Sequence, residues 1–202
     1  MNFLEIQNAV LTDRFREPKR AAAKRWINYR YGRVWASEDW AFKRQIATVT
    51  LNSGAQSTAL TGFHRILGLW DSSTGSLYSE IDPIRPEDYY GKTAVTQASP
   101  TGFTIVGNTI YFDRAASGAK SYQVIGELAF TELSADGDVP LLPAEFHYLL
   151  VPGAIAVGLR EENDPTWKEV EADFQAAFDD MKKGYLTQVR NYRDHYPSWP
   201  NP

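Results

Sequence analysis

Two helix-length patterns that follow each other almost directly constrain the fold most. The first opens at Pro140 and runs through the apolar block Tyr148–Leu159. The second begins at Asn163-Asp164-Pro165 and places apolar side chains at steps of three and four, which is one face of a 3.6-residue repeat. Those side chains are Trp167, Val170, Phe174, Ala177, Phe178, Met181 and Tyr185. The pattern predicts a long helix with a buried stripe.

Small residues interrupt the apolar block at Gly153, Ala154, Ala156 and Gly158. Such residues let two helices approach closely, and Pro152 is expected to kink the helix just before them. The expected partner is the long helix of the same chain. A contact between subunits is the alternative.

Residues 1–40 predict two further helices. The first rests on helical spacing of Phe3, Leu4, Gln7, Val10 and Leu11. The second is expected to start at Pro18, because proline is favoured at the first helical position, and to end near Gly32–Trp35. One side of it carries Ala22, Trp26, Tyr29 and Arg33.

From Gln45 the hydrophobic period changes to two, which is typical of strands. About five strands are expected over Gln45–Phe130, and the clearest feature is a hairpin with the turn Gly107-Asn108. No helix-length segment separates the strands, so they should be antiparallel. We therefore expect an α+β fold in a single domain, with a helical body (1–40 and 140–190), an antiparallel β insertion (41–135) and an extended C-terminal tail (191–202).

Composition excludes several classes of protein. The chain of 202 residues contains no cysteine, so disulfides, thiolate metal sites and cysteine nucleophiles are ruled out. Its net charge of -4 disfavours wholesale binding to nucleic acid. The start of the chain lacks the basic region and apolar core of a signal peptide, and the longest apolar run is shorter than the roughly 20 residues of a membrane span. We expect neither export nor insertion.

No catalytic pattern is recognisable. There is no phosphate-binding glycine loop, dinucleotide fingerprint or nucleophile elbow. The histidines His64, His147 and His195 stand far apart, and His147 is expected to make a structural hydrogen bond. Asp136-Gly137-Asp138 is the only acidic loop cluster, but it lacks the further oxygen ligands of a calcium loop and predicts a plain turn.

Two polar segments are candidate interaction surfaces. One is a basic segment whose members are Arg14, Arg16, Lys19, Arg20, Lys24, Arg25, Arg30 and Arg33. It could face nucleic acid or an acidic partner, or form an ordinary solvated helix face. The other is the C-terminal tail, which carries Tyr192, Tyr196 and Trp199 among three prolines in its last six residues. It could dock on a partner or fold back on its own domain.

Short motifs along the chain resemble the head-to-tail adaptor proteins of long-tailed bacteriophages, the connector subunits beneath the portal. They are Phe3-Leu4-Glu5-Ile6-Gln7 through Arg14-Phe15, Ala23-Lys24-Arg25-Trp26-Ile27-Asn28, Trp40 before the first strand, and Pro140-x-x-Pro143-x-x-Phe146-His147-x-Leu149-Leu150-Val151-x-Gly153-Ala154. The resemblance covers essentially the whole chain. The long Gly/Ser-containing β region departs from many relatives, which leaves its role open.

The resemblance implies a non-enzymatic virion protein of the phage neck, assembled in the host cytoplasm, with no cofactor and no membrane contact. It implies one subunit in a ring of about twelve that joins the portal to stopper or tail proteins, around a channel for genomic DNA bound without sequence specificity. The portal-binding residues it implies are Arg190, Tyr192, Arg193, Tyr196 and Trp199. The ring or channel contacts it implies are Arg14, Arg16, Lys19, Arg20, Lys24 and Arg25.

Two other functions remain open from the residues alone. A nucleic-acid-binding module would use the basic segment Arg14–Arg33 with Trp26 and Tyr29 interleaved. A hydrolase or sugar-binding domain would use aromatic residues of the β region, namely Trp70, Tyr89 and Tyr90, although no paired carboxylates stand at a readable spacing.

Overall fold

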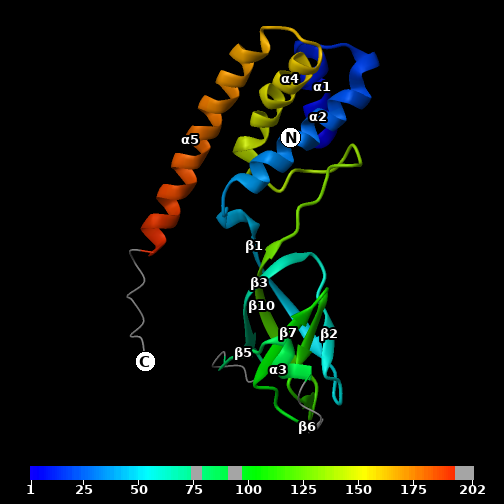
Figure 1. Cartoon of the computed structure of the whole chain (residues 1–202), viewed down its shortest axis with the longest axis vertical. Coiled ribbons are helices and arrows are strands. Elements are labelled where there is room, and N and C mark those ends of the chain that lie inside the picture. The colour runs from blue at the N-terminus through cyan, green and yellow to red at the C-terminus, as the bar shows by residue number, and fades with distance from the viewer. Residues whose placement is uncertain (74–78, 91–96, 194–202) are drawn as a thin grey trace. The chain divides into compact units, whose positions relative to one another are not determined.

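The computed structural model of the chain describes residues 1–73, 79–90 and 97–193, with only the backbone of Ser79, Tyr90 and 185–193 (Figure 1). The chain divides into two compact units. The helical unit comprises Met1–Lys43 and Phe130–Pro202, and the β unit comprises Arg44–Ala129. Helices and antiparallel or mixed sheets together confirm the α+β fold. The expected insertion of 41–135 exceeds the β unit at both ends, and the assignment of both units to a single domain stays a prediction.

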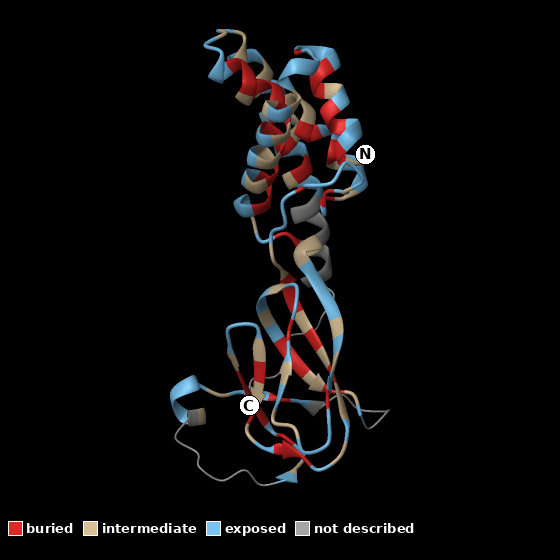
Figure 2. Ribbon diagram, turned by 90° about the vertical axis from the view of Figure 1, so that its right-hand side faces the viewer, coloured by how far each residue is buried: buried red, intermediate tan, exposed pale blue. Residues whose placement is uncertain are grey.

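The helical unit contains four α-helices and three short 3-10 helices among its described residues. In chain order they are α1 (Phe3–Asp13), η1 (Glu17–Lys19), α2 (Arg20–Ser37), η2 (Ala41–Lys43), η3 (Ala144–Leu149), α4 (Leu150–Glu161) and α5 (Trp167–Arg193). Helix α4 lies at the centre, since it contacts α1, α2 and α5. Buried residues lie along the inner sides of these helices (Figure 2).

Helix α1 begins with a capping box. The side chain of Asn2 accepts a hydrogen bond from the Glu5 N–H, and the Glu5 carboxylate accepts one from the Asn2 N–H. This capping box satisfies two amides that the helix itself leaves unpaired. The buried side chains are Phe3, Ile6, Gln7, Val10 and Leu11, which matches the expected stripe except that Ile6 is buried and Leu4 is exposed.

Helix α2 differs from its prediction in both its bounds and its buried face. Pro18 lies in η1 rather than at the start of the α-helix, and α2 extends to Ser37. Its buried side is Ala23, Trp26, Ile27, Tyr31, Val34 and Trp35, whereas Tyr29 is 56% exposed. The predicted buried face was wrong because Trp26 fits both the predicted row of residues and the row that the structure buries. The aliphatic residues beside Trp26 decide which of the two rows is buried.

Helix α4 uses its small residues within the chain. A Cβ at Gly158 would lie 2.7 Å from Phe15 and from Trp26, and a Cβ at Gly153 would lie 2.5 Å from the Arg30 side chain and 2.9 Å from Phe174. The close approach is therefore to α2 and Phe15 as well as to α5. Pro152 is the third residue of α4, in the first turn, where proline is tolerated, and the kink expected there stays a prediction.

Helix α5 follows its predicted stripe as far as Met181, while the side chain of Tyr185 lies outside the described part of the chain. Phe174, Phe178 and Met181 are buried, and Trp167, Val170 and Ala177 are half-buried. Backbone helix continues to Arg193, so the extended C-terminal tail expected from residue 191 cannot begin before residue 194. No proline stands between α5 and Pro197, which leaves the helix without a breaker at residue 191. Residues 194–202 lie outside the described part of the chain.

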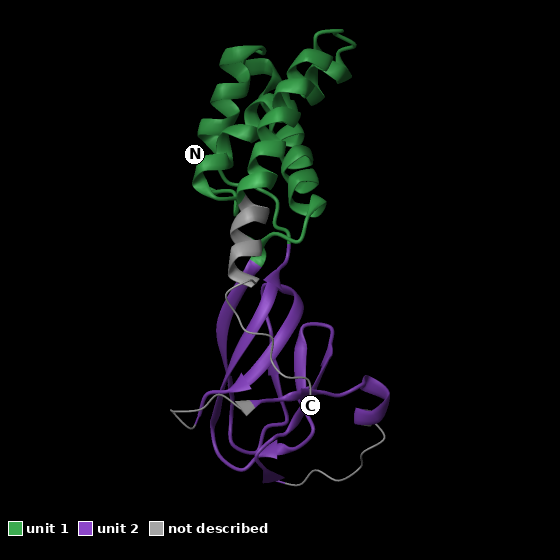
Figure 3. Ribbon diagram, turned by 90° about the vertical axis from the view of Figure 1, so that its left-hand side faces the viewer, with its two compact units in different colours: residues 1–43, 130–202 green, residues 44–129 purple. Residues whose placement is uncertain are grey.

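The β unit, purple in Figure 3, holds two four-stranded sheets and one strand pair. The first sheet has the order β1-β10-β3-β4 and the second β2-β8-β7-β5, while β6 pairs with β9. The strands are β1 (Arg44–Leu51), β2 (Ser57–Ala59), β3 (Phe63–Asp71), β4 (Ser79–Glu80), β5 (Asp82–Pro83), β6 (Gln97–Ala98), β7 (Gly102–Val106), β8 (Thr109–Phe112), β9 (Ala115–Ala116) and β10 (Lys120–Leu128). A short helix, α3 (Pro86–Tyr90), follows β5.

The predicted hairpin is confirmed. Strands β7 and β8 pair antiparallel from Phe103↔Phe112 to Val106↔Thr109, and Gly107 in the turn has φ +60°. A positive φ at the first turn position is what glycine provides in a primed hairpin turn. The inner residues of the β unit form one apolar cluster that includes Leu51, Leu69, Ile110, Phe112, Tyr122 and Val124.

We expected a wholly antiparallel β insertion, and this was wrong in part. The pairs β5–β7 and β6–β9 are parallel. Five of the strands are only two or three residues long, too short to show an alternating hydrophobic pattern. Both parallel pairs involve such short strands, which is why the sequence did not indicate them.

Candidate functional site

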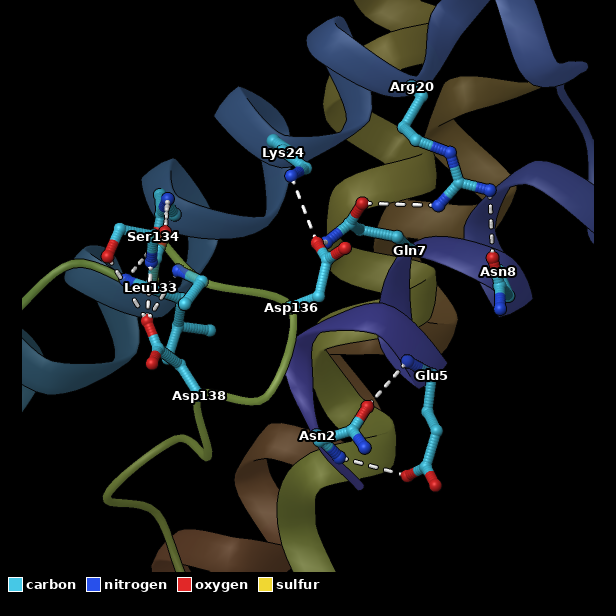
Figure 4. Close-up of polar contacts among 12 residues, drawn as sticks. Asn2, Glu5, Gln7, Asn8, Arg20, Lys24, Leu133, Ser134, Asp136 and Asp138 are labelled. Carbon is cyan, nitrogen blue, oxygen red and sulfur yellow. Dashed lines mark hydrogen bonds and ion pairs between the residues drawn. The ribbon is translucent and has the colours of Figure 1, made fainter.

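Much of the basic segment is used to hold the helical unit together (Figure 4). Lys24 Nζ lies 3.1 Å from Asp136 Oδ1, and the same oxygen accepts a weaker hydrogen bond from Gln7. Arg20 donates to Gln7 and Asn8 on α1 and pairs with Glu17 on η1. The Lys24 hydrogen bond, followed by that of Gln7, holds the pKa of Asp136 below its usual range. These contacts join α1, α2 and the loop 131–139.

Asp138, the second acidic residue of the loop 131–139, holds the loop in its conformation. Asp138 accepts hydrogen bonds from the backbone N–H groups of Ser134 and Ala135, which hold the pKa of Asp138 below its usual range. Asn28 on α2 exchanges two 2.9 Å hydrogen bonds with the backbone of Leu133. The Asp136-Gly137-Asp138 sequence is therefore a structural turn, as predicted.

His147 makes the structural hydrogen bond that its setting predicted. It is 2% exposed, and its Nε2 lies 2.7 Å from the Leu142 carbonyl oxygen. A carbonyl only accepts, so Nε2 donates. The other ring nitrogen, Nδ1, lies 2.9 Å from the Met1 nitrogen and 3.0 Å from the Met1 carbonyl oxygen. The ring connects the segment before α1 to η3, and both of its nitrogens have partners there.

A groove of about 580 Å³ opens on the helical unit between α2 and α5, with α4 as its floor. Four arginines, three aromatic residues and two glutamates dominate its lining. The lining residues are Arg25, Trp26, Tyr29, Arg30, Arg33, Ala156, Val157, Arg160, Glu161, Trp167 and Glu171. We call this feature the arginine groove.

The inner end of the arginine groove is rigidly built. The Arg30 guanidinium donates twice to the Glu171 carboxylate and once, over 3.2 Å, to the Gly153 carbonyl. It also stacks on the Phe174 ring at 4.3 Å from the ring centre. Only 12% of the Arg30 side chain is exposed. Arg30 is a structural cation that joins α2 to α4 and α5.

The outer part of the groove presents charge to solvent. Arg25 pairs with Glu161 at 2.9 Å, yet its side chain is 67% exposed, where an ion pair contributes little. Arg160 lies over the Trp167 ring at 5.4 Å. Arg33 is exposed and has no ion pair within the described residues. Four arginines against two glutamates leave the lining with an excess of positive charge.

The remaining predicted basic residues are scattered over the surface near the start of α2. Lys19 pairs with Glu162. Hydrogen bonds from the Thr166 N–H and hydroxyl, with a smaller effect of the Arg14 charge, hold the pKa of Asp164 below its usual range. Arg16 is exposed. The structure thus ties Lys19, Arg20, Lys24 and Arg25 to acids of their own unit, and their role as ring or channel contacts stays a prediction.

The predicted portal-binding residues lie at the end of the described chain. Arg190, Tyr192 and Arg193 are in the last turns of α5, where only the backbone is described, and Tyr196 and Trp199 are outside the described residues. Sequence reasoning missed the arginine groove, because its lining comes from three helices. The spacing Arg25, Tyr29, Arg33 was the signal that could have indicated it.

In the β unit, the aromatic residues proposed for a ligand site pack on their own strands. The Trp70 ring covers Gly68, where a Cβ would lie 2.2 Å from it, and Tyr89 packs on Tyr111 at 5.8 Å. The Tyr90 side chain is not described. Burial, with the charges of Asp71 and Asp113, raises the pKa of the Tyr122 phenol. At neutral pH Tyr122 is therefore a neutral core residue.

Within the described residues, no three His, Asp or Glu side chains gather as they would around a metal ion. None of the described helices combines the length and the apolar character needed to cross a membrane.

Comparison with known proteins gives this arrangement its context. The sequence model of the SU10 adaptor protein family matches residues 1–199. The chain therefore belongs to the SU10 adaptor protein family, as the motifs of its helices predicted. Adaptors of this family are structural proteins of bacteriophages. The comparison with curated proteins gives no match.

Proposed function

We propose that this protein is a ring subunit of the phage neck that joins the portal to stopper or tail proteins. The observation that carries the proposal is the family match over residues 1–199, nearly the full chain. The helical unit supports it, because its buried polar side chains serve contacts between its own segments, while the arginine groove stays open to solvent. In this proposal about twelve copies surround a channel for genomic DNA.

The C-terminal tail is the proposed portal-binding segment. Helix α5 carries Arg190, Tyr192 and Arg193 to the end of the described chain, and Tyr196 and Trp199 follow beyond it. Aromatic and arginine side chains are the residue types that dominate binding energy at protein interfaces. We place these five residues against the portal.

The genome would pass the ring without sequence-specific contacts. Exposed basic side chains such as Arg14 and Arg16 would then meet phosphates, with contacts that weaken as salt increases. The chain as a whole carries a net charge of -4, which favours passage over tight binding. The neck assembles in the host cytoplasm in this proposal, with no membrane step.

The test is binding of the full chain to the purified portal ring. Wild type should bind portal with a saturating ratio of one adaptor per portal subunit, measured by native mass spectrometry. A variant ending at Arg193 and the variant Tyr196→Ala/Trp199→Ala should lose most of this binding, while Arg65→Ala on the β unit serves as a control that keeps it. Failure of wild type to bind portal would refute the proposal.

The nucleic-acid-binding alternative receives less support. Lys19, Arg20, Lys24, Arg25 and Arg30 are paired with acids of the helical unit, so fewer charges remain for phosphates than the sequence suggests. A salt-sensitive mobility shift of duplex DNA by the isolated chain at low ionic strength would restore this alternative.

A further inference from the structure

Two sides of the helical unit carry opposite charge. On the groove side, Arg25, Tyr29 and Arg33 follow one another at steps of four along α2, which places them in one row on the helix surface. Arg160 of α4 lines the same groove. Tyr29, at the centre of this row, is 56% exposed. This basic row forms the outer wall of the arginine groove.

The opposite charge lies on the far side of α5. Glu169, Asp173, Ala176 and Asp180 are exposed and follow at steps of four, three and four, which again is one row on a helix. At about 100° per residue, the three acids lie about 160–180° around the helix from Glu171. Glu171 faces the groove, so this acidic row faces away from it. Among the residues that the structure describes, the only ion pair of Asp180 is an exposed contact of 3.5 Å with Lys183.

The two rows fit each other in length and in chemistry. The basic row spans about 12 Å and the acidic row about 16 Å at 1.5 Å per residue. Ala176 and the nearby exposed Ala172 leave room between the acids for the Tyr29 ring to lie against the helix. Both rows are on rigid helices of the same unit, since α2 and α5 each pack on α4.

We propose that the arginine groove of one copy receives the acidic row of α5 from the next copy of this chain. The contact joins two different faces, so it is head-to-tail and can close into a ring. This inference rests on the proposed ring function and names the interface that would build it. Arg25, Arg33 and Arg160 pair with Glu169, Asp173 and Asp180, and Tyr29 packs between them.

The groove's own glutamates argue for a helix as occupant rather than a phosphate backbone. Glu161 and Glu171 line the groove beside the arginines, and they would repel a continuous row of phosphates while leaving a helix with spaced acids room to avoid them. Charge pairs of this type steer association and weaken with salt.

The test uses two complementary charge reversals in the full chain. Variant A carries Arg25→Glu and Arg33→Glu, and variant B carries Glu169→Arg and Asp173→Arg. In A both faces are acidic, and in B both are basic, so neither should associate with itself. Mixed together, each groove meets an opposite charge, and A and B can alternate around any ring with an even number of subunits.

Sedimentation velocity at low ionic strength, over a concentration series, measures the result. The dissociation constant of the A and B mixture should be at least about tenfold lower than that of A or B alone. Circular dichroism and thermal melting establish that A and B are folded. Association of the mixture no stronger than that of each variant alone, with both folded, overturns the inference.

Matched controls separate this interface from other occupants of the groove. Arg14→Glu/Arg16→Glu and Asp179→Arg change charge outside the two rows and should leave self-association at the wild-type level. The mixture of A and B, each ending at Arg193, should still associate. Loss of association on that truncation would show that residues 194–202 occupy the groove and would overturn the inference.

The outcome is distinguishable from failure of the proposed function. If wild type does not bind the portal while A and B associate with each other, the proposed portal role is wrong and the proposed interface is supported. If wild type binds the portal but A and B do not pair, the interface fails and the portal role stands. Duplex DNA binding that A loses, without pairing of A and B, would assign the groove to phosphates instead and overturn the inference.

Discussion

In the helical unit, side chains make the contacts that fix one element against another, whereas in the β unit backbone hydrogen bonds do much of this work. Arg30, Asn28 and His147 each connect segments more than 100 residues apart, except for the local His147–Leu142 bond. In the β unit the ladder from Arg44↔Glu127 to Leu51↔Lys120 fixes β1 on β10 through the backbone.

The difference follows from where helices and strands find the partners of their backbone hydrogen bonds. A helix satisfies its amides internally and must be positioned by its side chains, while a strand satisfies them across to its neighbour. Polar substitutions should therefore damage the helical unit more than the β unit, although both units depend equally on their apolar cores.

The largest effects should come from emptying either core. Phe3 and Phe112 are both fully buried, one in each unit. We expect Phe3→Ala and Phe112→Ala each to lower the free energy of unfolding of their own unit by about 3–5 kcal/mol. Amide hydrogen exchange should show faster exchange in the substituted unit alone. Faster exchange of the slowest amides in both units would mean that they unfold together.

The next largest loss of stability should distinguish the buried Arg30 from the exposed Arg33. Arg30→Met should destabilise the helical unit by roughly 2–3 kcal/mol, because it removes charged hydrogen bonds and leaves Glu171 unpaired. Arg33→Met is the matched control, and it should change stability by less than about 0.5 kcal/mol. Urea unfolding of both variants measures the difference. Equal losses would contradict the assignment of Arg30 as the structural cation of the groove.

A smaller effect compares two glycines of the helical unit. Gly158→Ala should cost about 1–3 kcal/mol, since the added Cβ overlaps Phe15 and Trp26. Gly184 of α5 has open space around it, so Gly184→Ala should stabilise the unit by up to about 1 kcal/mol through helix propensity. Thermal melting of both proteins gives the comparison, and a neutral Gly158→Ala would contradict the close packing of α4.

The smallest effect is a pH dependence. The pKa of Asp138 is lowered in the folded state, so the charged carboxylate stabilises the loop at neutral pH, and this contribution is lost as pH falls through the folded pKa. Wild type should melt at a higher temperature than Asp138→Asn at pH 7, and the two should converge as the pH falls below about 4, the ordinary pKa of an Asp. A constant gap across this range would show that the carboxylate charge has no such role.

The sequence predicted features that depend on local spacing. The α5 stripe, the Gly107-Asn108 hairpin and the hydrogen bond between His147 and Leu142 all follow from residues close together in the chain. The buried face of α2 did not, because Trp26 fits two rows and only the packing of Ile27 and Val34 decides between them. The two-residue strands were missed for a different reason, since they have too few residues to show a period.

The candidate site was harder to predict than the fold. Counting basic residues between Arg14 and Arg33 could not distinguish the paired Arg30 from the exposed Arg33. The partner of Arg30 is more than 100 residues away in the sequence, and Arg33 has no ion pair in the described part of the chain. The family, by contrast, was recognisable from short motifs in the helices, and the family model confirms it over residues 1–199.

The most direct test of the account is the mass of the complex between this protein and its portal ring, measured on intact assemblies. A closed ring of adaptor subunits, equal in number to the portal subunits, should form on the portal with the wild-type protein. A portal ring that remains bare in the presence of excess wild-type protein would contradict it.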